Sequence, residues 1–154
     1  MGRVGGGKSS ILASILAEMP YCSGTVLKNG SIAYVEQEPI IFTTTIKENI
    51  LFGNILDSNK YEKVLECCCL DEDLSIWEKG DETVVGERGL TLSGGQKARL
   101  ALARALYSDS DIYLLDDPLS AVDAKVARKI HDKLCGYMVG KKTIILVTHQ
   151  THFL

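Results

Sequence analysis

The chain has 154 residues, of which 45% are hydrophobic and 24% are charged, and its formal net charge is −3. These values are typical of one globular domain with a real hydrophobic core. No segment is densely basic and no apolar run has membrane-spanning length, so the sequence disfavours nucleic acid as a partner and predicts no transmembrane helix.

The chain contains five cysteines: Cys22, Cys67, Cys68, Cys69 and Cys135. No two of them form a CxxC pair, and three consecutive residues on a helix point in different directions rather than toward one metal ion. The odd count also argues against a disulfide framework. We therefore expect buried or half-buried thiols in a reducing compartment, in a domain that faces the cytosol.

The first segment fits the phosphate-loop pattern G-x-x-x-x-G-K-[ST], from Gly2 to Ser9, and continues into a helical pattern that Pro20 closes. In such a loop the glycines let backbone amides curl round phosphates, Lys8 reaches the β- and γ-phosphates, and the Ser9 hydroxyl ligates Mg²⁺. The nucleotide-binding candidates here are Gly2, Gly5, Gly6, Gly7, Lys8, Ser9 and Ser10. The same pattern also occurs by chance in glycine-rich loops.

Residues 25–28 and 31–35 are predicted to be strands of a hairpin around Asn29-Gly30, a strong short hairpin signal. The second strand ends in a polar turn that contains Gln37. Gln37 is a candidate contact to Mg²⁺ or to water if this strand end lies near the phosphates. Taken alone, Gln37 is more typical of a solvated loop.

The capping-box pattern from Thr45 to Glu48 predicts a short helix that ends at Gly53. Residues 57–77 have a helical but polar pattern, which indicates a small helical layer standing on the core. Residues 80–89 are predicted to form an irregular loop, in which Glu87-Arg88 is either a solvated turn or a contact to a partner.

The segment Leu92-Ser93-Gly94-Gly95-Gln96 opens an Ala/Leu-rich run of good helix formers. Ser93 is predicted to be the N-cap, and Gln96 closes a capping box. The leading amides of this helix then carry no bulky side chains and suit a phosphate. The alternative, equally open from these residues alone, is that Ser93 only caps and the glycines only turn.

The apolar run from Asp111 ends in Asp116-Asp117-Pro118, which is typical of a buried parallel strand with acids at its carboxyl end. Asp116 is a candidate to hold Mg²⁺ through water, and Asp117 to face a water that attacks the γ-phosphate. Residues 120–123 are predicted to begin another capped helix. A last strand over 143–148 ends at His149, which either hydrogen-bonds a γ-phosphate or is simply exposed. Alternating strands and helices predict an α/β sheet.

Together these segments closely resemble the nucleotide-binding domain of an ATP-binding-cassette (ABC) transporter. Residues 2–9 match its Walker A motif, Gln37 its Q-loop, and residues 92–96 its signature motif. Residues 114–116 match Walker B, residues 120–123 the D-loop, and His149 the switch histidine. Residues 45–53, 86–89 and 112–123 look most similar to the first such domain of the multidrug-resistance-associated subfamily, which includes the cystic fibrosis channel.

The resemblance implies a P-loop NTPase fold of ABC type, with a mainly parallel core sheet and a helical signature subdomain. Residues 1–50 and 107–154 would form the RecA-like core, and about 51–106 the helical subdomain. Relative to the family, the N-terminal strands and the C-terminal part are missing, so we interpret the chain as part of a larger transporter. We expect it to be marginally stable as an isolated polypeptide.

The resemblance also implies ATP and Mg²⁺ as cofactors and ATP hydrolysis that drives transport. In this family the signature of one domain closes over the ATP held by a second, so Ser93, Gly94, Gly95 and Gln96 would contact a partner's nucleotide. The expected partners are that second nucleotide-binding domain and the transmembrane domains of the same transporter. These domains would hold the chain at the cytosolic face of a membrane, with no role for nucleic acid.

The sequence departs from the wider family at Asp117, where a glutamate usually follows the Walker B aspartate. A misplacement of ~1 Å can cost about 10²-fold in rate, so we expect good ATP binding with slow hydrolysis. The alternatives are an ATP-binding switch with negligible turnover, and a soluble cassette ATPase without membrane partners.

Overall fold

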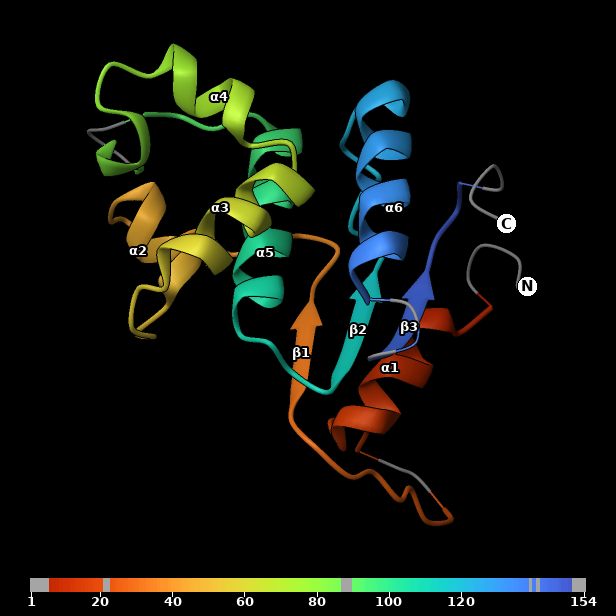
Figure 1. The fold of residues 1–154 in the computed structure, drawn as a ribbon. Helices are drawn as coiled ribbons and strands as arrows, with labels where there is room; N and C mark the ends of the chain where they lie inside the picture. Colours follow the sequence, from red (N-terminus) through yellow and green to blue (C-terminus); the bar gives the residue numbers. More distant parts are fainter. Residues whose placement is uncertain (1–5, 21–22, 87–89, 139, 141, 151–154) are drawn as a thin grey trace.

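A three-stranded parallel sheet, in the order β1-β2-β3, lies at the centre of the computed structural model (Figure 1). The structure describes residues 6–20, 23–86, 90–138, 140 and 142–150. The strands are β1 (Ile32–Val35), β2 (Ile112–Asp116) and β3 (Thr143–Val147). Parallel strands need crossover connections. A long helical excursion joins β1 to β2, and α6 (Ala124–Met138) joins β2 to β3. The predicted α/β fold with a parallel sheet is therefore confirmed.

The other helices precede the sheet or build the excursion between β1 and β2. They are α1 (Lys8–Leu16), α2 (Ile46–Leu51), α3 (Ser58–Cys67), α4 (Asp71–Ile76), a 3₁₀ turn η1 (Gly80–Glu82) and α5 (Gly94–Tyr107). Helix α5 packs on β1, α2 and α3, whereas α3 also contacts α6. Within the described residues, no helix combines the length and the apolar character that crossing a membrane requires.

Successive side chains of a strand point to opposite faces of the sheet, and different helices cover these two faces. Ala33, Val35, Tyr113 and Leu115 are buried in one continuous core cluster with residues of α5 and α6. The register pairs Ala33 with Tyr113 and Val35 with Leu115, so these four share a face. Leu114 is also fully buried, but it lies outside that cluster, and α1 packs against β2. Helix α1 therefore covers the opposite face.

Both predicted capping boxes are present. At α2 the Thr45 hydroxyl accepts a hydrogen bond from Glu48 N, and the Glu48 side chain accepts one from Thr45 N. At α5 the Ser93 hydroxyl and the Gln96 side chain make the same reciprocal pair. Each box satisfies two of the backbone donors that a helix start leaves unpaired.

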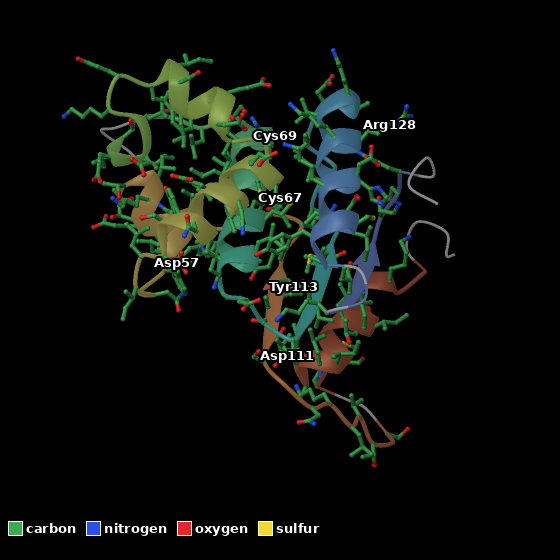
Figure 2. The ribbon with its side chains drawn as sticks, viewed as in Figure 1. Asp57, Cys67, Cys69, Asp111, Tyr113 and Arg128 are labelled. Carbon is green, nitrogen blue, oxygen red and sulfur yellow. The ribbon has the colours of Figure 1, made fainter. Side chains whose placement is uncertain are left out.

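The predicted hairpin is wrong. Residues 25–28 form no strand, and Val26 and Leu27 are exposed. The start of β1 pairs instead with β2, since Asp111 N and Ile112 N both donate to Ser31 O. Asp111 Oδ2 in turn accepts from Ser31 N at 2.8 Å and lies at the start of β2 (Figure 2). Non-local pairing in the buried sheet thus takes precedence over the local Asn-Gly turn signal.

The predicted helical layer over residues 57–77 consists of two helices, and Cys69, with a left-handed φ of 51°, lies in the turn between them. One helix start differs from the prediction. Residues 120–122 form a turn, and the next helix begins at Ala124, where Asp123 Oδ1 accepts from Lys125 N.

The cysteines divide into two groups. Cys67, Cys68 and Cys69 are buried, as expected, whereas Cys135 on α6 is exposed, contrary to the prediction. Figure 2 shows where Cys67 and Cys69 lie at the end of α3. Cys22 and the Glu87-Arg88 pair lie outside the described residues.

Candidate functional site

A pocket of about 370 Å³ opens where α1 begins and where β1, β2 and β3 end. Its lining comes from four segments that are far apart in the sequence: Gly6, Gly7, Lys8, Ser9, Ser10, Gln37, Asp116, Asp117, Val147 and His149. The carboxyl ends of parallel strands are the usual ligand-binding edge of an open α/β sheet. Most of the predicted site residues therefore share one pocket. Gly2 and Gly5 lie outside the described residues.

The start of α1 is suited to an anion. Gly7 is the N-cap, its φ of 79° is left-handed, and no side chain caps the helix. Because Gly7 has no Cβ, the chain can make this turn without strain. The first amides of α1 are thus left for a ligand, at the end of the helix where the dipole favours negative charge. Ser9 and Ser10 are exposed beside these amides, and Lys8 is half-buried.

The opposite wall of the pocket is acidic and fixed in position. Asp116 and Asp117 are 4% and 5% exposed, although both are carboxylates. Asp117 adopts a left-handed φ of 47°, and its amide donates to Val147 O at 2.8 Å. Its carbonyl accepts from both the amide and the hydroxyl of Ser120. Backbone bonds therefore hold Asp117 at the strand end, where His149 N donates to its Oδ1 at 3.4 Å.

The donor set fits a magnesium nucleotide. Hydroxyl, amide and carboxylate oxygens are hard ligands of the kind that Mg²⁺ accepts, and Ser9, Gln37 and Asp116 supply one of each. Lys8 and the uncapped α1 amides are complementary to phosphate charge. Gln37 and His149 are exposed at the rim.

The signature residues 92–96 lie elsewhere, at the start of α5. None of them is among the described residues that line the pocket. Ser93 and Gly94 are exposed, while Gly95 and Gln96 are half-buried. A Cβ on Gly95 would come within 2.9 Å of Ala121 O, so glycine is needed there for close packing against the turn that follows β2. The structure thus brings the signature against residues 121–122, but not into the pocket of its own chain.

Sequence reasoning missed two polar clusters around α5. In one, Arg104 Nε and Nη2 donate to Asn49 O and Oδ1, and Arg104 Nη1 donates to Ile40 O. In the other, Asp73 of α4 contacts both Gln96 and Arg99. Arg104 is 55 and 64 residues from its partners Asn49 and Ile40, and Asp73 is 23 and 26 residues from Gln96 and Arg99, so no local sequence pattern predicts these contacts. The signal in the sequence was the presence of two arginines, Arg99 and Arg104, in an Ala/Leu-rich helix.

Comparisons with known proteins identify the family of the chain. Residues 1–120 match the ABC transporter family. The chain is 53% identical over its whole length to the mouse protein ATP-binding cassette sub-family C member 4. It is 50% identical over its whole length to a probable multidrug resistance-associated protein of Drosophila melanogaster. It is 51% identical over 99% of its length to ABC transporter C family member 3 of Arabidopsis thaliana.

The chain spans only 12%, 11% and 10% of the length of these three proteins, respectively, so it corresponds to a small part of each. The matched part contains the phosphate loop, the signature and the acidic strand end in one continuous segment. This chain belongs to the ABC transporter family, and its relatives are transporters of sub-family C.

Proposed function

We propose that this chain binds Mg²⁺-ATP and, together with a second nucleotide-binding domain, hydrolyses it to drive transport across a membrane. The observation that carries the proposal is the pocket that joins residues 6–10 to Gln37, Asp116, Asp117 and His149. Its basic and amide-rich wall faces an acidic wall, which is the charge arrangement that a metal-bound triphosphate requires.

Each residue has a role that its place in the pocket supports. Lys8 and the α1 amides would neutralise and orient the phosphates. Ser9, Gln37 and Asp116 would hold Mg²⁺, which supplies charge neutralisation when bound. Asp117 would orient the attacking water, and His149 would hydrogen-bond the γ-phosphate.

A second domain is part of the proposal because the signature lies outside the pocket of its own chain. Ser93 and Gly94 are exposed and would close, with the half-buried Gly95, over nucleotide held by that domain. The exposed amides at a helix start suit a phosphate, as at α1. ATP would then link the two domains, and hydrolysis would release them.

Membrane partners are supported by an apolar surface beside β1. A second pocket of about 370 Å³ lies between β1, α5 and the segments that flank α2, and Ile40, Phe42 and Phe52 around it are 61%, 43% and 58% exposed. An apolar surface of this kind favours a protein contact. We propose that it receives the transmembrane domains, which would keep the chain at the cytosolic face of the membrane.

Asp117 supports a second candidate, an ATP-binding switch with weak turnover. Its side chain is one methylene shorter than glutamate, and backbone bonds prevent the strand end from moving to compensate. In this case ATP would still control association of the domains, while the partner's site would do most of the hydrolysis.

The test uses a chimeric transporter, the mouse sub-family C member 4 protein with this chain in place of its matching segment. ATP-dependent substrate uptake and hydrolysis are measured in membrane vesicles. We expect Lys8→Ala to abolish both, whereas Lys125→Ala, at an exposed lysine on α6, leaves both within about twofold, as is usual for surface changes. Unchanged uptake in the Lys8→Ala chimera would reject the proposed function.

A further inference from the structure

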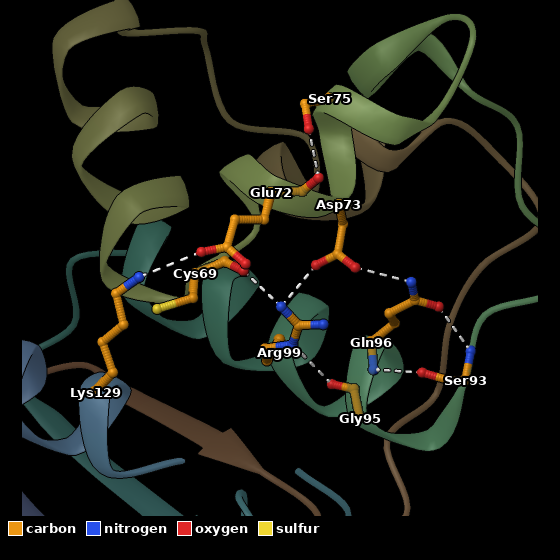
Figure 3. Close-up of polar contacts among 9 residues, drawn as sticks. All are labelled: Cys69, Glu72, Asp73, Ser75, Ser93, Gly95, Gln96, Arg99 and Lys129. Atoms are coloured by element: carbon orange, nitrogen blue, oxygen red, sulfur yellow. Dashed lines mark hydrogen bonds and ion pairs between the residues drawn. The ribbon is translucent and has the colours of Figure 1, made fainter. Parts of the chain in front are cut away.

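The side-chain amide of Gln96 is engaged at both ends (Figure 3). Its Oε1 accepts from Ser93 N at 2.9 Å, which is half of the capping box. Its Nε2 donates to Asp73 Oδ1 at 2.8 Å, across to α4. A capping box needs only the first bond. The second ties the start of the signature helix to a carboxylate 23 residues earlier in the chain.

Asp73 also selects the orientation of that amide. A carboxylate only accepts hydrogen bonds, so it requires the NH₂ group of Gln96 on its side. The Gln96 oxygen then faces the Ser93 amide. The reverse orientation would set oxygen against the carboxylate and NH₂ against the Ser93 N–H, and both contacts would be repulsive.

The charge of Asp73 is compensated by Arg99. The residue is 8% exposed, and the side chains of Asp73 and Arg99 are 11% and 14% exposed. Arg99 Nη1 lies 2.6 Å from Asp73 Oδ2, but it directs a hydrogen bond to Cys69 O at 2.5 Å, so the carboxylate contact is an ion pair without hydrogen-bond alignment. Arg99 Nε donates to Gly95 O at 3.3 Å. The same arginine therefore contacts α4, the turn before it and the signature glycine.

The turn before α4 is shaped to make this contact. Cys69 adopts its left-handed φ of 51° between α3 and α4, and its side chain is 2% exposed. A non-glycine residue in this region is uncommon and signals a conformation that the surroundings impose. Here the turn presents the Cys69 carbonyl to Arg99.

We propose that Asp73 is a positioning residue of the signature: through Gln96 and Arg99 it fixes the turn at residues 93–95, in which the Gly94 and Gly95 amides face a partner's nucleotide. This inference rests on the proposed function for its consequence in catalysis, but its structural part does not. A simple ion pair that only attaches α4 to α5 would leave the Ser93–Gln96 bonds unaffected.

The first test measures amide hydrogen exchange in the chimeric transporter without nucleotide. Asp73→Ala, which removes the acceptor, is compared with Glu72→Ala, the same truncation at the neighbouring carboxylate, which is exposed and pairs only loosely with Lys129 at 3.4 Å. We expect exchange at residues 93–97 to become about tenfold faster in Asp73→Ala, the effect of one lost hydrogen bond, and to stay within about twofold in Glu72→Ala. Equal exchange in the two variants would overturn the proposal.

A second variant covers the case in which Asp73→Ala loosens the whole helical layer. Asp73→Ala combined with Arg99→Gln removes both buried charges and leaves no unpaired ion. Faster exchange at 93–97, with α3 still protected, supports the positioning role. Unchanged exchange at 93–97 in this double variant overturns it.

The second readout is the ATP concentration that gives half-maximal hydrolysis. We expect Asp73→Ala and Gln96→Ala each to raise it about tenfold, because both break the same link between Asp73 and Gln96, and we expect Asp73→Ala to leave turnover at saturating ATP within about twofold. Their combination should raise it no further, and multiplied effects would contradict the inference. A chimera with no ATP hydrolysis at all would instead reject the proposed function, and hydrogen exchange would still decide the role of Asp73.

Discussion

Arg104 is predicted to hold the segment after Gln37 to the signature helix. Its guanidinium donates to Asn49 O at 2.9 Å, to Asn49 Oδ1 at 2.8 Å and to Ile40 O at 2.9 Å. It also lies 5.0 and 5.2 Å from the ring centroids of Phe42 and Phe52. Burial lowers the pKa of Arg104 but leaves an arginine fully charged at neutral pH. Replacement by leucine removes all of these contacts.

The loss of stability in Arg104→Leu depends on which hydrogen bonds each acceptor of Arg104 keeps after the substitution. Asn49 is 1% exposed and its carbonyl lies in the last turn of α2, so losing its donor costs about 1–3 kcal/mol. Asn49 Oδ1 keeps its bond from Phe42 N, and Ile40, 61% exposed, can turn to water. The lost ring contacts add about 0.5–1 kcal/mol. We therefore expect the local opening free energy of residues 40–52 to fall by about 2–4 kcal/mol.

Hydrogen exchange in the chimeric transporter measures this change. A loss of about 2–4 kcal/mol accelerates exchange of amides such as Phe42 N by roughly 30- to 1,000-fold. Arg104→Lys keeps the charge but lacks the planar guanidinium, so its exchange rate should lie between those of the native chain and of Arg104→Leu. Arg128→Leu, at an exposed site on α6, is the control. Exchange within about twofold of the native chain in Arg104→Leu would refute the reasoning.

Three further predictions concern the site and the cysteines. Asp117→Glu should raise the single-turnover hydrolysis rate of the chimeric transporter by up to about 10²-fold, because the longer side chain places the carboxylate nearer to the attacking water. Equal rates in the two proteins would mean that Asp117 does not limit turnover. Gly95→Ala should lower the rate of ATP hydrolysis without weakening ATP binding to residues 6–10, since the added Cβ would meet Ala121 O at 2.9 Å. Full hydrolysis activity in this variant would show that the turn at residues 121–122 can move to accommodate the Cβ. A thiol reagent at pH 8 should label Cys135 at least about tenfold faster than Cys67, because burial raises the pKa of Cys67 to about 11 and only the thiolate reacts. Comparable labelling rates for the two cysteines would mean that α3 opens readily.

Much of the fold could be predicted because its signals are local or simple. The capping boxes at Thr45 and Ser93 depend on residues three positions apart, and both formed as predicted. The buried strand before Asp116 was visible as an apolar run with acids at its end. The hairpin prediction was wrong because residues 31–35 could pair either with residues 25–28 or with β2, and only the complete fold determines that they pair with β2.

The pocket could be predicted as a set of residues but not as a geometry. Lys8, Gln37, Asp116 and His149 each follow or precede a predicted element, and parallel strands bring such ends to one edge. The left-handed turn at Asp117 and the links of Asp73 to Gln96 and Arg99 depend on contacts between distant segments. No single-sequence pattern encodes them, because Asp73 stands in the acidic run 71–73 with nothing to distinguish it.

The central claim is that this chain holds ATP in its own pocket and offers its signature to another. Covalent labelling by a photoreactive ATP analogue, under conditions that prevent hydrolysis, tests it in the chimeric transporter. The label bound to peptides of this chain's pocket is compared between Lys8→Ala and Ser93→Ala. We predict that Lys8→Ala reduces this label at least about tenfold, as expected when the phosphate charge loses its cationic partner, and that Ser93→Ala leaves it within about twofold. Equal loss in the two variants, or full labelling in Lys8→Ala, would contradict the account.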